Sequence, residues 1–177
     1  MPTIYEDTRQ QVARGDKHAI KHEWFAAHGI EVVRRKLDFG DYATDESNIV
    51  VDTKANVGEL AMDVGRDHGR FAREMERARD AGYRLVIMVE TNRPYVDLDS
   101  LVDWTSSACR MCRHYKAVRC VPHEKVKCIK FRRKPIQGVA VMRICKSMEA
   151  HYKCRFVFVQ PHNAAQAICD ALGVTYE

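Results

Sequence analysis

The 177-residue sequence is short of features that define several classes of protein. No window approaches the roughly 18 apolar residues that a membrane-spanning helix needs, so we expect no membrane partner. The N-terminus, Met-Pro-Thr-Ile-Tyr-Glu-Asp, lacks the basic start and the apolar run of a signal peptide, which favours a cytoplasmic location. No internal repeat or low-complexity segment occurs. Hydrophobic residues still make up 46% of the chain, which is enough for one domain with its own core.

Seven cysteines stand out in a chain without an export signal. Because reducing compartments disfavour disulfides, we expect free thiols or metal ligands. One group has the spacing of a tetrahedral zinc site and consists of Cys109, Cys112, Cys120 and His123, with Cys128 as a substitute for His123. The alternative is a set of scattered buried thiols. For Cys145, Cys154 and Cys169, which lie on apolar faces, we predict core positions.

Positive charge is concentrated in one segment of the chain. Residues 104–148 hold 12 Lys and Arg and a single acid, Glu124, whereas residues 1–103 hold 15 bases and 20 acids. A basic segment attached to an acidic half suits a phosphate backbone that lies across both, since counterion release drives nucleic-acid binding. We predict phosphate contacts from Arg132, Arg133 and Lys134. A solvated charged surface is the alternative.

The most specific chemical pattern lies in two short segments, Gly40-Asp41 and Val50-Val51-Asp52-Thr53-Lys54. Residues two apart on a strand share one face, so the Asp52 carboxylate and the Lys54 ammonium reach the same point. Asp41 and Asp52 supply the oxygen ligands that Mg²⁺ or Mn²⁺ prefer. Lys54 would orient the attacking water and stabilise the charged transition state of phosphodiester hydrolysis. Gly-Asp alone is also a common turn, and a strand-end lysine alone can be a bystander.

Hydrophobic periodicity predicts strands that alternate with helices. Strands are expected at residues 3–6, 30–34, 36–39, 49–54, 84–90 and 155–159, and helices at 16–28, 60–78, 98–104, 136–152 and 163–172. Residues 36–39 would form a half-buried edge that turns at Gly40 and pairs with 49–54 as a hairpin. Gly65 and Gly69 are expected to divide the long helical segment in two. This order predicts an α/β fold in which helices flank a mixed central sheet.

Several motifs occur in a fixed order over residues 3–90. They are Ile4-Tyr5-Glu6-Asp7-Thr8-Arg9, Gly40-Asp41-Tyr42, Asp52-Thr53-Lys54, Asp67-His68-Gly69-Arg70-Phe71 followed by Glu74 and Arg77, and a strand that ends in Glu90. This order resembles the XPF-type nuclease domain of the restriction-endonuclease-like superfamily, in its stand-alone bacterial or phage form. The resemblance implies that residues 1–177 are one nuclease domain. Residues 1–95 would form its catalytic core, 96–135 a basic cysteine-containing insertion, and 136–177 a closing helix–strand–helix unit.

The resemblance also implies roles for residues around the metal pair. It places Asp7 and Arg9 near the metal and the scissile phosphate, Arg70 near a phosphate, and Glu74 near the water that the metal binds. Arg70 and Glu74 lie four residues apart on one helical face, so an ordinary salt bridge between them is the alternative.

The chain departs from the family pattern at three positions. Asp52-Thr53-Lys54 replaces Glu-Arg-Lys, Gln10 replaces the glutamate of Asp-x-Arg-Glu, and the acid expected after the lysine is Glu59, one position late. His18 and His22 have metal-compatible i,i+4 spacing. We assign them no carboxylate or third ligand, so we expect exposed helix residues.

Three functions agree with these patterns. The first is a Mg²⁺-dependent or Mn²⁺-dependent DNA endonuclease that acts on branched or structured DNA, in repair or recombination. The second is a non-catalytic DNA-binding or scaffold module derived from a nuclease, which the retention of Asp41, Asp52 and Lys54 disfavours. The third is a zinc-binding interaction protein, which rests on the cysteines alone. DNA is the expected partner of the first two, and a homodimer is a further expectation.

Overall fold

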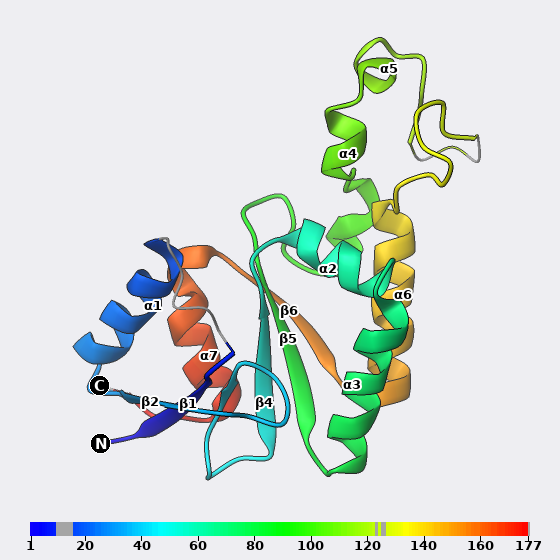
Figure 1. Ribbon diagram of the computed structural model, residues 1–177. Coiled ribbons are helices and arrows are strands. Elements are labelled where there is room, and N and C mark those ends of the chain that lie inside the picture. The colour runs from blue at the N-terminus through cyan, green and yellow to red at the C-terminus, as the bar shows by residue number, and fades with distance from the viewer. Residues whose placement is uncertain (10–15, 123, 125–126, 177) are drawn as a thin grey trace.

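The computed structural model describes residues 1–9, 16–122, 124 and 127–176, and within these ranges the chain forms a six-stranded mixed sheet (Figure 1). The strands are β1 (Thr3–Asp7), β2 (Glu31–Arg35), β3 (Tyr42–Ala43), β4 (Ile49–Lys54), β5 (Arg84–Glu90) and β6 (Arg155–Val159), in the order β2-β1-β3-β4-β5-β6. The short strand β3 is antiparallel to β1 and β4, and all other pairs are parallel. The predicted α/β class with a mixed central sheet is confirmed.

Helices cover both faces of this sheet (Figure 1). One face packs on α1 (Asp16–Ala27) and α7 (Ala164–Leu172), and the other on α2 (Val57–Val64), α3 (His68–Asp80) and α6 (Gly138–Tyr152). The short 3₁₀ turn η1 (Asp99–Asp103) follows β5, and the 3₁₀ turn η2 (Pro161–Asn163) leads from β6 into α7. The predicted division of the helical segment 60–78 is confirmed at Gly65, where α2 ends, whereas Gly69 lies inside α3, which starts at His68.

Strand β5 explains why the two faces have separate cores. Its side chains alternate between the faces, so Ile87 packs with the α2, α3 and α6 side chains while Met88 packs with α1 and α7. A strand buried on both faces needs a continuous apolar run, which is what residues 85–89 supply. The same alternation in β4 puts Val50, Asp52 and Lys54 on the face of α2 and α3. The pattern of β4 therefore decides on which face its polar residues act.

The predicted edge strand at residues 36–39 is wrong, because these residues form a loop. Hydrogen bonds from side chains to the loop backbone take the place of hydrogen bonds to a neighbouring strand. The Leu37 N–H donates to Asp7 Oδ1 (3.4 Å), and the Leu37 carbonyl accepts from Arg9 Nη2 (2.7 Å). The antiparallel partner of β4 is instead β3, with Tyr42 opposite Val51. Asp41 consequently lies just before a strand, and its N–H donates to the Val51 carbonyl (2.7 Å).

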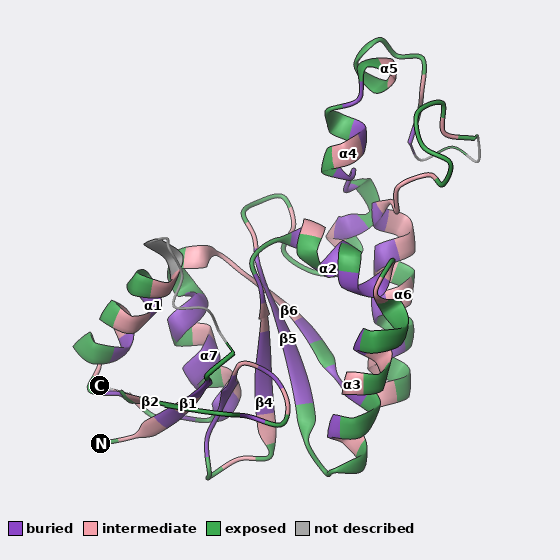
Figure 2. Ribbon diagram, viewed as in Figure 1, coloured by how far each residue is buried: buried purple, intermediate pink, exposed green. Residues whose placement is uncertain are grey.

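Residues 105–135, here called the cysteine lobe, project from the body of the molecule (Figure 1). The lobe contains only two one-turn helices among its described residues, α4 (Ser107–Arg110) and α5 (Arg113–Lys116). Most of these described residues are exposed (Figure 2). Both of its ends are fixed at η1, because the Gly138 N–H donates to the Trp104 carbonyl (2.9 Å). A Cβ at Gly138 would lie 1.7 Å from the Leu101 carbonyl oxygen, so only glycine permits this contact. Within the described ranges, none of the helices has the length and apolarity that a membrane crossing requires.

Candidate active site

An open pocket of about 310 Å³ lies on the α3 side of the sheet, where β1 and β4 end. Its lining consists of Asp7, Arg9, Gly40, Asp41, Asp52, Lys54, Arg70, Phe71 and Glu74. The structure therefore brings all seven residues that we predicted as catalytic to one place. They come from two strands, a loop and a helix, so the fold and not the local sequence assembles them.

Asp52 and Lys54 form the buried floor of the pocket. Lys54 Nζ lies 2.8 Å from Asp52 Oδ2 and 2.8 Å from Asp63 Oδ2. Burial raises the pKa of Asp52 to about 7, against the attraction of Lys54 and with smaller contributions from Asp41 and Glu74. Burial alone would lower the pKa of Lys54, but the two carboxylates outweigh it and the net shift is upward. Lys54 is therefore an ammonium, whereas Asp52 gains or loses its proton near neutral pH.

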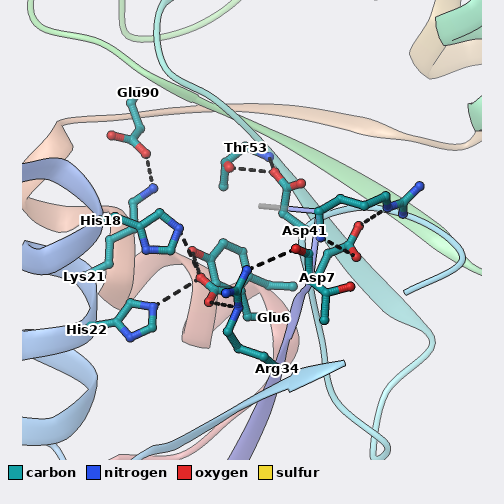
Figure 3. Close-up of polar contacts among 12 residues, drawn as sticks. Glu6, Asp7, His18, Lys21, His22, Arg34, Asp41, Thr53 and Glu90 are labelled. Carbon is teal, nitrogen blue, oxygen red and sulfur yellow. Dashed lines mark hydrogen bonds and ion pairs between the residues drawn. The ribbon is translucent and has the colours of Figure 1, made fainter. Parts of the chain in front are cut away.

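Asp41 is held in place by the backbone and by Thr53 (Figure 3). The Thr53 N–H and the Thr53 hydroxyl both donate to Asp41 Oδ2, each at 2.7 Å. Gly40 makes this approach to β4 feasible, since its φ is +64° and a Cβ would lie 2.9 Å from the Val51 carbonyl oxygen. Thr53, which stands where the family motif has an arginine, thus positions Asp41.

Asp7 and Arg9 form the opposite wall of the pocket. Arg9 Nε lies 2.5 Å from Asp7 Oδ2, and the Arg9 backbone N–H donates to Asp7 Oδ1 (3.2 Å). The Asp7 side chain is buried, whereas the Arg9 side chain is 60% exposed. A buried acid with an exposed guanidinium beside it agrees with the implied positions near a cation and a phosphate. The roles themselves stay predictions.

Asp63 is a residue of this site that sequence reasoning missed. It is buried on α2, and its carboxylate lies between Lys54 and Arg70, with Arg70 Nη2 3.3 Å from Oδ1. Arg70 thus pairs with Asp63, and the alternative salt bridge from Arg70 to Glu74 does not occur among the described ion pairs. The available signal was an acid on the apolar face of α2, between Leu60 and Val64.

Two other acids of the motif lie outside the pocket. Glu59 accepts from the Ala55 N–H (2.7 Å), and its own N–H donates to Asn56 Oδ1 (3.0 Å), so it helps to cap α2. Glu90 ends β5 on the α1 face, where it pairs with Lys21 (Figure 3). Gln10, at the remaining departure, lies outside the described residues.

The pocket suits a hard divalent cation. Asp41 and Asp52 offer carboxylate oxygens, the ligand type that Mg²⁺ and Mn²⁺ prefer. The Asp52 carboxyl is buried, and burial is the main cause that raises its pKa. A divalent cation beside it would stabilise its ionised form. The residues present therefore fit the implied metal.

The lobe cysteines act on one another, since Cys128, Cys120 and Cys112 add to the effect of burial in raising the pKa of Cys109. Cys109 and Cys112 are buried, Cys120 and Cys128 are half-buried, and His123 lies outside the described residues. In the described part of the chain, no three of these sulfur atoms lie within 4.8 Å of one another. The prediction that Cys145, Cys154 and Cys169 belong to the core is confirmed, since all three are buried.

The three basic residues predicted to contact DNA differ in their surroundings. Arg132 and Arg133 are exposed at the surface of the lobe. The Lys134 ammonium instead donates to the Glu124 carbonyl and to the Val121 carbonyl (3.3 Å). Lys134 therefore has a structural contact within the lobe that the other two lack.

Comparison with known proteins identifies the fold. Neither a family model nor a curated protein matches the sequence. Among solved structures, XPF from Aeropyrum pernix is similar with a TM-score of 0.57 at 16% identity, over 97% of this chain and 63% of that chain. The same protein in complex with DNA has a TM-score of 0.58 at 17% identity, over 98% and 64% of the two chains. The chain thus spans less than two thirds of these structures.

The class that follows is an XPF-like nuclease fold. The resemblance inferred from the order of the motifs is confirmed at the level of the fold. At this identity the likeness concerns the fold alone.

Proposed function

We propose that this chain is a metal-dependent DNA endonuclease that hydrolyses phosphodiester bonds in branched or structured DNA. The observation that carries the proposal is the convergence of Asp41, Asp52 and Lys54 in one open pocket. Two acids with a lysine ammonium are the components that phosphodiester hydrolysis requires: ligands for a cation and a charge beside the reacting phosphate. The likeness to an XPF structure in complex with DNA supports a polynucleotide as the substrate.

Asp41 and Asp52 would hold Mg²⁺ or Mn²⁺, which supplies a Lewis acid and lowers the pKa of a bound water. Thr53 keeps Asp41 in the required orientation through its two hydrogen bonds. Because Lys54 is an ammonium, it acts by stabilising negative charge at the phosphate and by orienting the water, without taking up a proton. Asp63 positions Lys54 from behind.

Two arginines at the rim complete the site. Arg70 is paired with Asp63 at one nitrogen while its side chain is 70% exposed, so the rest of the guanidinium faces solvent. Arg9 is exposed beside Asp7 on the opposite wall. Guanidinium groups bind phosphate oxygens in pairs, so these two residues are suited to clamp the backbone on either side of the cleaved bond. Glu74 borders the pocket on the α3 side, where it would orient the attacking water.

The test is a panel of labelled single-stranded, flap, fork and junction DNAs. We expect cleavage of at least one branched substrate with Mg²⁺ or Mn²⁺, binding with little cleavage in Ca²⁺, and no cleavage in excess EDTA. Asp52→Asn should bind the same substrate without cutting it, while Asp45→Asn, an exposed acid outside the pocket, should cut normally. Tight binding without cleavage under every metal would instead assign the chain to the non-catalytic DNA-binding class.

A further inference from the structure

A second polar cluster lies on the α1 face of the sheet, behind the pocket (Figure 3). It consists of Glu6 on β1 and His18 and His22 on α1. The His22 Nε2 atom lies 3.2 Å and the His18 Nε2 atom 3.3 Å from the same atom, Glu6 Oε1. Glu6 is completely buried. Among the described residues, this is the one group of three His, Cys, Asp or Glu side chains whose donor atoms all lie within 4.8 Å of one another.

The fold brings these residues together by two simple periodicities. Residues 18 and 22 are one helical turn apart and share a face of α1. Successive side chains of β1 point to opposite faces, so Glu6 points toward α1 while Asp7 points into the pocket. The expectation that His18 and His22 are exposed residues without a carboxylate partner is therefore wrong. Their partner comes from a strand and not from the helix itself.

Hydrogen bonds account for only part of this cluster, because His22 Nε2 and the Tyr42 hydroxyl bind Glu6 Oε1 but His18 Nε2 is left without one in the described part of the chain. Glu6 Oε1 has two lone pairs, yet it faces both imidazoles and the Tyr42 hydroxyl, which donates to it at 3.1 Å. Glu6 Oε2 and His18 Nε2 are buried and make no hydrogen bond within the described part of the chain. Native proteins rarely leave such atoms unsatisfied. A cation bound by Glu6 Oε1 and the two imidazole nitrogens would satisfy His18 Nε2, whereas Glu6 Oε2 faces Arg34.

The charges around the cluster leave room for a cation at Oε1. The Lys21 ammonium is paired with Glu90. Arg34 Nε lies 3.5 Å from Glu6 Oε2, on the other oxygen of the carboxylate. A guanidinium on one oxygen and a metal ion on the other is the arrangement by which outer residues orient a metal-ligating carboxylate.

The distances between the donor atoms match a small transition-metal ion. In a tetrahedral site with bonds of 2.0–2.1 Å, neighbouring ligand atoms lie about 3.3–3.4 Å apart. The two nitrogen-to-oxygen distances in the cluster are 3.2 and 3.3 Å. Imidazole nitrogens favour Zn²⁺, Co²⁺ or Ni²⁺, whereas Mg²⁺ prefers an all-oxygen site. The His22 side chain is 40% exposed, so an ion has access from solvent on that side.

We propose that Glu6, His18 and His22 bind one transition-metal ion of the zinc type, separately from the cation of the pocket. The ion ties α1 to β1, and it fixes Glu6 and Tyr42, whose neighbours in sequence are Asp7 and Asp41. Its role is to stabilise the back of the sheet at the level of the pocket. The proposal stands whether or not the pocket cleaves DNA.

The test uses full-length protein with Cys109→Ser and Cys112→Ser, so that the cysteine lobe does not contribute to metal binding. After chelator treatment, this protein is titrated with Co²⁺, and binding is followed by the visible d–d bands and by the rise in thermal midpoint. We expect one equivalent to bind without sulfur charge-transfer absorption. Zn²⁺ should displace it, and millimolar Mg²⁺ should not.

Ligand variants decide the assignment. His22→Gln, at the exposed ligand, should weaken Co²⁺ binding at least tenfold and remove the thermal shift, whereas His162→Gln, an exposed histidine outside the cluster, should change neither. The double variant His18→Gln, His22→Gln should bind no stoichiometric Co²⁺. It leaves the buried Glu6 unchanged, so it tests the site without the folding risk of Glu6→Gln. Absence of Co²⁺ binding by the parent protein would overturn the proposal. Unchanged binding by the double variant would do so equally.

Discussion

The pocket and the cysteine lobe differ in what holds their functional side chains in place. Asp52 and Lys54 belong to a strand that pairs on both sides and packs on α2 and α3. The lobe has two one-turn helices, exposed basic residues and few buried side chains in its described part (Figure 2). Packing therefore fixes the geometry of the pocket, while the lobe is held by contacts such as those of the Lys134 ammonium with two backbone carbonyls.

This difference predicts separate failures in the two regions. A change in the pocket should remove chemistry while binding persists. A change in the lobe should weaken binding or loosen the lobe while the pocket stays intact.

Asp52→Asn should lower the cleavage rate by at least about 100-fold, because the loss of one group that stabilises the transition state has an effect of this order. The variant should fold, since asparagine has nearly the same shape and the buried charge is costly in the native protein. Single-turnover rates at saturating Mg²⁺ measure the effect, with Asp45→Asn as the control. Equal rates for Asp52→Asn and the native protein would contradict the assignment.

The pH dependence of stability should also report on Asp52. Its folded pKa, about 7, is above its ordinary value, so its contribution to stability is present at low pH and is lost as pH rises from about 4 to about 7. Without added metal, the native protein should lose on the order of 2 kcal/mol relative to Asp52→Asn between pH 5 and pH 8. Urea unfolding of both proteins at the two pH values measures this difference. Parallel stability curves would refute it.

Cys109→Ser tests whether zinc organises the lobe, which we propose for Cys109, Cys112 and Cys120 with Cys128 or His123. The native protein should then contain zinc in the lobe, and the variant should lose it and exchange amide protons faster across residues 105–135. The site proposed at Glu6 could hold a second zinc ion in both proteins. The measured quantity is therefore the difference in zinc content between the native protein and Cys109→Ser, which should be one equivalent per chain. Cys169→Ser, at a buried core cysteine, is the control. Equal zinc content in Cys109→Ser and the native protein would leave the lobe cysteines as ordinary thiols.

The double variant Arg132→Ala, Arg133→Ala should have the smallest effect. Each lost phosphate contact lowers the salt slope of DNA binding by about 0.9, so the slope should fall by roughly 2 units with no change in the cleavage rate of bound substrate. Lys134→Ala should instead loosen the lobe, because its ammonium binds two carbonyls there. Binding measured at several salt concentrations gives the slope. An unaltered slope would show that the two arginines face away from DNA.

The parts of the site that sequence predicted are those with local periodicity. The two-residue repeat of β4 placed Asp52 and Lys54 together, and the apolar run of residues 85–89 placed β5 at the centre of the sheet. The parts that it missed depend on contacts between distant segments. Asp63 meets Lys54 only when α2 packs on β4, and Glu6 meets His18 only when α1 packs on β1.

Local patterns also gave a wrong prediction where side chains, and not a neighbouring strand, bind the backbone. The alternation at residues 36–39 predicted a strand, but the backbone of Leu37 is bound by Asp7 and Arg9. Such competition between side chain and backbone is decided by tertiary contacts.

Cleavage started in a preformed complex separates the chemistry of the pocket from DNA binding. The native protein and Lys54→Met are each bound to a cleavable branched DNA in Ca²⁺, complex formation is verified, and excess Mg²⁺ is then added. The native complex should yield product within a single turnover, and the Lys54→Met complex should stay bound and uncut. Product formation at the same rate in both complexes, or none from the native complex, would contradict the assignment of this pocket as a nuclease centre.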